Sequence, residues 1–227
     1  MHALTSEEFQ QIAEPVLRQV FVGNNDQEPF LPHIEERLLL YCPRGGVVRD
    51  NKYWERQRME ALCQAAQLIG DTGFYLAILW EQPTAQFSTE NHYAYIPLSE
   101  LVDALAALPG SRTSVEVQLN MPCRSVFGSC LCPTSGRWGM LIYLDDYGFL
   151  GGTSEFMKAV RHAFPEIDEE VLEFLHFLNL EYLDDVKSGL IRKLDNENID
   201  PPWLKQLLTH VYGSSKAEQL LAENRPV

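Results

Sequence analysis

Three cysteines, Cys123, Cys130 and Cys132, lie in a segment that also contains several glycines and prolines. Such a composition is typical of a loop, and thiolates in a loop could bind zinc or act as nucleophiles. The spacing C-x6-C-x-C lacks the short gaps of two to four residues that pair zinc ligands, and His92 or His162 would have to supply a fourth ligand through folding. We therefore expect no metal and no cofactor, and interpret the cysteines as half-buried structural thiols.

A catalytic cysteine would need a histidine in contact and a third group to orient that histidine. None of the six histidines lies in a recognisable signature, and the usual hydrolase and nucleotide-binding motifs are missing from the sequence. An enzyme of unfamiliar type, which would use the Cys123–Cys132 segment on an anionic substrate, is kept as the alternative hypothesis. It predicts a pocket where the cysteines and a histidine converge.

Five basic residues surround Gly45 and Gly46 and could hold an anion at a glycine-rich turn before a helix. They are Arg44, Arg49, Lys52, Arg56 and Arg58. Because the chain has a surplus of acid, we expect these side chains to pair with carboxylates of the same chain.

Glu173 and His176 have the E-x-x-H spacing that puts a carboxylate and an imidazole on one face of a helix. Di-iron bundles need two such motifs and two further glutamates, and the sequence contains no second copy. We therefore interpret the pair as part of an amphipathic helix whose acidic face is exposed.

Carboxylates dominate the region from Glu155 to Asp200. Twelve acidic side chains there face five basic ones, which gives half of the net charge of −14. Because the acidic residues alternate with large apolar ones, the region can pack and still present a charged face. We expect a partner-binding surface formed by two groups of residues. One is an exposed hairpin tip with Asp145, Asp146 and Tyr147 next to Glu155, and the other is the helical set Glu169, Glu170, Glu173, Asp184 and Asp185.

Hydrophobic spacing predicts the elements that position these residues. Helices are expected at 6–21, 32–41, 51–69, 99–108, 153–164 and 168–186 and from residue 200 onward. Strands are expected at 74–80, 92–96, 113–119, 138–144 and 147–150. The order of these elements predicts an α+β fold, with a mostly antiparallel sheet of four or five strands in the middle of the chain, packed by N-terminal and C-terminal helices.

Length and composition set the remaining expectations. The 227 residues suit a single α+β domain, 1–227, although residues 1–70 could form a helical subdomain of their own. A sequence pI near 4.8 disfavours nucleic acid as a partner, and no apolar run is long enough for a membrane span. Five cysteines at low density and the lack of a signal sequence favour the cytoplasm.

The acidic surface suggests a function. We expect a soluble protein-binding module that binds a basic protein, for example an immunity or antidote protein that neutralises a bacterial toxin. A nuclease must be basic to hold phosphate, so an inhibitor gains association rate by presenting clustered carboxylates.

Overall fold

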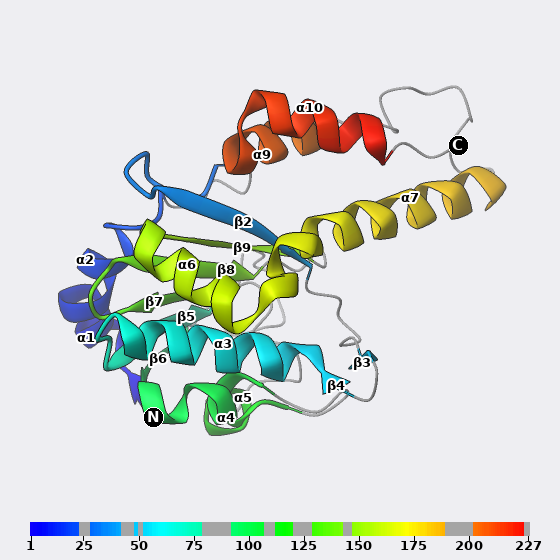
Figure 1. Ribbon diagram of the computed structural model, residues 1–227. Helices are drawn as coiled ribbons and strands as arrows, with labels where there is room; N and C mark the ends of the chain where they lie inside the picture. The colour runs from blue at the N-terminus through cyan, green and yellow to red at the C-terminus, as the bar shows by residue number, and fades with distance from the viewer. Residues whose placement is uncertain are drawn as a thin grey trace.

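The protein has an α+β fold built on a seven-stranded antiparallel sheet (Figure 1). The computed structural model describes residues 1–22, 28–41, 48–49, 52–78, 92–106, 112–119, 129–142, 147–188 and 202–224. The strand order is β1-β6-β5-β7-β8-β9-β2, and a separate two-stranded ribbon pairs β3 (Val48–Arg49) with β4 (Lys52–Tyr53). The strands of the large sheet are β1 (His2–Leu4), β2 (Glu36–Tyr41), β5 (Gly73–Ile78), β6 (His92–Pro97), β7 (Ser129–Pro133), β8 (Trp138–Ile142) and β9 (Tyr147–Gly152).

The expectation of four or five strands is wrong because both edge strands and one central strand were missed. β2 was expected to be helical. Its side chains alternate between the two faces of the sheet, with Leu38 and Leu40 in one core and Leu39 in the other. A strand covered on both faces has no polar side, so its apolar run is hard to distinguish from a buried helix.

The segment 113–119, expected to be a strand, is the short helix α5 (Ser114–Gln118). The hydroxyl of Thr113 accepts the backbone N–H of Glu116 at 3.2 Å, and the Glu116 carboxylate accepts the N–H of Thr113 at 2.8 Å. This capping box fixes a helix start. In a strand, Val115 and Val117 would lie on the same face, because side chains two positions apart do so. In the structure Val115 is buried while Val117 is 54% exposed.

Helices cover both faces of the sheet and form two hydrophobic cores. The first face carries α3 (Trp54–Leu68), η2 (Leu98–Glu100), α4 (Leu101–Leu105), α5 and α6 (Ser154–Ala163), with α3 and α6 side by side in Figure 1. The second core takes side chains from the π-helical turn η1 (Phe9–Ala13), α7 (Glu170–Ser188), α9 (Pro202–Tyr212) and α10 (Ser214–Glu223), with α2 (Glu14–Leu17) packed against it. Helix α1 (Ser6–Glu8) precedes η1 and buries no side chain. None of the described helices is both long enough and apolar enough to cross a membrane.

Two ends of the sheet matter for the candidate site. At one end, here called the Tyr41 end, β2 finishes and β9 begins, since Tyr41 and Tyr147 are register partners. At the other, the Gly152 end, β9 finishes and α6 begins. The chain returns to the Tyr41 end through α6 and the 3-10 turn η3 (Pro165–Glu169), after which α7 starts.

Small residues at the end of β9 let other elements pack closely. A Cβ on Gly151 would lie 2.8 Å from the ring of Phe30, and one on Gly152 would lie 2.9 Å from the ring of Phe156. The double glycine therefore accommodates the segment before β2 on one face and helix α6 on the other. Thr153 caps α6 by accepting the N–H of Phe156 at 3.4 Å.

Candidate functional site

A buried ion pair fixes the start of α7 against the Tyr41 end of the sheet. Arg58 of α3 donates two hydrogen bonds to the carboxylate of Glu170, at 3.1 and 2.8 Å. The same carboxylate accepts the backbone N–H of Tyr41 at 2.9 Å, and Arg58 also donates to the Tyr41 carbonyl at 2.8 Å. Glu170 is 0% exposed. The prediction that Glu170 belongs to an exposed partner-binding surface is therefore wrong. Its carboxylate instead connects α3, β2 and α7.

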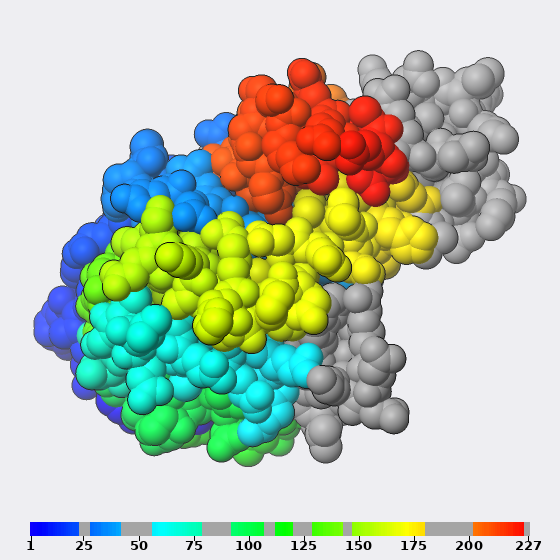
Figure 2. All heavy atoms as spheres, in the orientation of Figure 1, coloured from blue at the N-terminus to red at the C-terminus, as the bar shows by residue number. Residues whose placement is uncertain are grey.

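The carboxylates next to Glu170 point outward. Glu166, Asp168 and Glu169 of η3 are exposed, and Glu173 is half-buried one turn into α7. We call these four residues the acidic junction. Figure 2 shows that η3 and the first turns of α7 form open surface between α3 and the α9–α10 pair.

Two described basic side chains close to the acidic junction, Arg58 and Arg161, form ion pairs within the chain. Arg58 is held by Glu170, and Arg161 of α6 pairs with Asp168 at 3.0 Å and with Glu36 of β2. Among the described residues, Glu166 and Glu169 have no ion pair with any basic side chain. The junction therefore retains net negative charge at its surface.

The outer face of α7 continues this surface. Glu169, Leu172, Glu173 and His176 follow one another at three- and four-residue spacing, so they share one side of the helix. Leu172 is 42% exposed, and His176 is exposed. Within the described part of the chain, no three histidine, cysteine or acidic side chains lie together in a way that could hold a metal ion.

Tyr147 does not sit at an exposed tip. It is the first residue of β9, is 7% exposed, and packs its ring 5.3 Å from that of Phe174 and 6.4 Å from that of Trp203. Asp145 and Asp146 lie outside the described residues. Tyr147 itself lies next to the first turns of α7, through its contact with Phe174.

Glu155 lies away from this region. It is exposed in the first turn of α6, after the Gly152 end of β9. At about 3.4 Å per residue, the length of β9 separates the two ends by roughly 17 Å. The expectation that Glu155 lies next to Tyr147 is therefore wrong. Asp184 and Asp185 belong to the last turns of α7, but their side chains lie outside what the structure describes.

The basic cluster was expected to pair with carboxylates of the same chain. The two of its side chains that the structure describes form such ion pairs. Arg56 pairs with Glu60 at 3.0 Å and with Asp103 at 3.4 Å, and Arg58 pairs with Glu170. The side chains of Arg49 and Lys52, and the whole of Arg44, lie outside the described residues.

Two of the three clustered cysteines lie in a strand rather than in a loop. Cys130 and Cys132 belong to β7 and are buried, while Cys123 lies outside the described residues. The Cys132 thiol lies 3.6 Å from the carbonyls of Pro133 and Trp138, to which it donates, and burial strongly raises its pKa. A thiol held in this protonated form is a poor nucleophile.

Neither histidine considered as a partner is placed to activate these thiols. His92 is the register partner of Ile78, whereas Cys130 pairs with Ala77, so the two side chains project from opposite faces of the sheet. His162 is exposed in the last turn of α6. Neither His92 nor His162 therefore forms with Cys130 or Cys132 the pair that the enzyme hypothesis requires.

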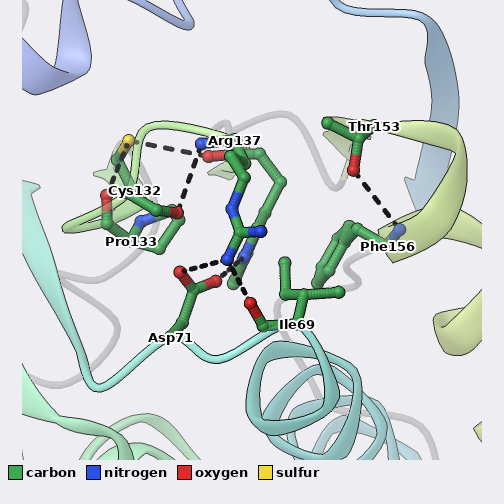
Figure 3. Close-up of polar contacts among 9 residues, drawn as sticks. Ile69, Asp71, Cys132, Pro133, Arg137, Thr153 and Phe156 are labelled. Atoms are coloured by element: carbon green, nitrogen blue, oxygen red, sulfur yellow. Dashed lines mark hydrogen bonds and ion pairs between the residues drawn. The ribbon is translucent and has the colours of Figure 1, made fainter.

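The polar cluster near Cys132 joins structural elements (Figure 3). Asp71 is buried and accepts the indole N–H of Trp138 at 2.9 Å, and it forms an ion pair with Arg137 at 3.5 Å. Arg137 also donates to the carbonyl of Ile69 at the end of α3. These contacts tie the β7–β8 turn to the end of α3, and the cluster contains no histidine.

A small cavity lies between α3, α4 and the sheet. Its lining consists of Met59, Leu76, Leu105, Ser129, Leu131, Met140 and Ile142. It has room for about one water molecule. No cysteine or histidine lines it, so it is not the pocket that the enzyme hypothesis predicts.

Comparison of the chain with protein families, with curated proteins and with solved structures found no match. The functional argument therefore rests on the residues themselves, and in particular on the acidic junction, where Glu166, Asp168 and Glu169 are exposed.

Proposed function

We propose that the protein is a binding module that captures a basic protein through the acidic junction, in the manner of an immunity or antidote protein that neutralises a basic toxin. The observation that carries the proposal is the uncompensated charge of Glu166 and Glu169. Both are exposed, while the nearby guanidinium groups of Arg58 and Arg161 form pairs within the chain.

Electrostatics explains why such a surface suits a basic partner. Clustered carboxylates attract a positively charged protein over the distance of a Debye length, about 8 Å at physiological salt, and this increases the association rate. The surface also resembles the phosphates that a nuclease must bind, so it would orient that kind of partner.

The internal contacts favour tight binding as well. Glu170 and Arg58 hold the start of α7 in place, so the neighbouring carboxylates are presented on a rigid support and lose little freedom on binding. Leu172 adds an apolar side chain between Glu169 and Glu173, and an apolar centre within a charged rim is the usual composition of an interface.

The first experiment identifies the partner. The tagged protein is incubated with extract of the cells that express it natively, at low and at high salt, and the retained proteins are identified by mass spectrometry. A basic protein retained at low salt and released at high salt is the expected result. Recovery of the chain alone would count against the proposal.

The second experiment locates the binding surface. Charge reversal in the variant Glu166→Lys/Glu169→Lys should slow association with the identified partner. The matched control, Glu7→Lys/Glu14→Lys, makes the same charge change on α1 and α2, which lie at the left edge of Figure 1, apart from the start of α7. If both variants slow association equally, net charge matters and the acidic junction does not.

A further inference from the structure

Helix α9 covers the free edge of the sheet. Among the described strands, β2 pairs only with β9, so alternate backbone groups of β2 face outward from the sheet. One of them, the N–H of Leu39, donates to the hydroxyl of Tyr212 at 3.1 Å. Arg37 of β2 donates to the backbone carbonyl of His210 at 2.8 Å. An edge strand that is covered in this way cannot pair with another chain.

Two buried nitrogen atoms in this contact have no hydrogen-bond partner among the described residues. They are Nε of Arg37 and Nε2 of His210. The imidazole ring lies parallel to the ring of Phe30, with the centroids 6.5 Å apart. In a neutral imidazole with its proton on Nδ1, the buried Nε2 carries no hydrogen and needs no acceptor, whereas a proton added to Nε2 would find none, with the guanidinium of Arg37 held beside it at the His210 carbonyl. In a protonated His210 both ring nitrogens would be donors, so the buried Nε2 would carry a hydrogen without an acceptor.

The surroundings of His210 lower its pKa on balance. Arg37 approaches from β2, and Glu28 approaches from the segment before β2, where it accepts the side-chain amide of Gln206 at 3.3 Å. Burial lowers the pKa of His210, the positive charge of Arg37 lowers it further, and the attraction of Glu28 opposes both effects without cancelling them. A neutral imidazole is therefore the form that fits this contact.

We propose that α9 and α10 form a pH-sensitive cover of edge strand β2, which stays docked while His210 is neutral and loosens when His210 takes up a proton. The sign follows from linkage. Because the docked state binds the proton less well than the open state, docking weakens as pH falls below about 6.5, the ordinary pKa of histidine. Opening exposes the N–H of Leu39 for pairing with another strand.

Amide hydrogen exchange measured by NMR tests this proposal. Protection of the Leu39 amide and of the α9 amides, corrected for intrinsic exchange, is compared at several pH values between 7.5 and 5. For the uptake of one proton, we expect protection to fall by up to about tenfold per pH unit below pH 6.5. Protection that does not change over this range would overturn the proposal.

Two variants assign the effect to His210. His210→Phe keeps an aromatic ring against Phe30 but cannot be protonated, so its protection should not depend on pH. His176→Gln, which removes an exposed histidine from α7, should behave like the wild type. An equal pH dependence in His210→Phe would refute the assignment.

If His210→Phe does not fold, the ring of His210 can be titrated by NMR in the wild-type protein. It should titrate below pH 6.5, and a higher value would contradict the proposal.

Discussion

Glu169 and Glu170 are neighbours in the sequence but should respond oppositely to mutation. Replacing Glu170 by alanine removes a carboxylate that accepts two hydrogen bonds from Arg58 and one from the backbone of Tyr41. It also leaves the guanidinium of Arg58 buried without its counter-charge. Breaking one partner of a buried ion pair costs about 3–5 kcal/mol, so we expect the free energy of unfolding to fall by that amount.

Urea unfolding at pH 7 provides the assay. Glu169→Ala is the matched control and should change the free energy of unfolding by less than about 0.5 kcal/mol, since Glu169 is exposed. The double variant Arg58→Met/Glu170→Leu removes both charges and should recover much of the stability, because apolar residues of similar volume can replace a buried ion pair. A loss below about 1 kcal/mol for Glu170→Ala would refute the structural role assigned to the pair.

Three further predictions concern packing and the thiols. Tyr212→Phe leaves a backbone N–H of β2 without its acceptor and should lower the free energy of unfolding by about 1–2 kcal/mol, measured by urea unfolding; an unchanged value would contradict the edge contact. Gly151→Ala would place a Cβ 2.8 Å from the ring of Phe30, and this overpacking should cost about 1–3 kcal/mol in the same assay; a stabilised variant would show that the contact is wrong. In the native protein at pH 8, iodoacetamide should modify the half-buried Cys63 well before the fully buried Cys132, as followed by mass spectrometry; rapid modification of Cys132 would revive the enzyme hypothesis.

Much of the helical structure could be predicted from the sequence. The helices α3, α6 and α7 have apolar residues at helical spacing, and a capping residue or proline marks where α6 and α9 begin. The hairpin of β8 and β9 was also expected, because the sequence between the two strands, with Asp145 and Asp146, is typical of a turn.

Two of the three missed strands share one physical cause. β2 and β7 are covered on both faces, so the apolar and polar alternation of a half-exposed strand is not present in their sequences. β1 has only three residues and pairs with a strand about 90 positions further along the chain. Nothing in its local sequence indicates that pairing.

The candidate site could be predicted only as a region. The sequence indicates that the carboxylates of 166–173 lie on or near a helix, yet it does not distinguish the exposed Glu169 from the buried Glu170. Arg58, which makes that difference, is 112 positions away. Spatial neighbours at such a separation are defined by the fold and not by any local pattern.

The association rate of the partner, once it is identified, tests the central claim most directly. The rate constant is measured over a range of salt concentrations for the wild type, for Glu166→Lys/Glu169→Lys and for the control Glu7→Lys/Glu14→Lys. We predict that the wild-type rate falls steeply with salt, and that reversal at the acidic junction slows association about tenfold or more at low salt while the control stays close to the wild type. A wild-type rate that does not depend on salt, or a junction variant that associates as fast as the control, would contradict the account.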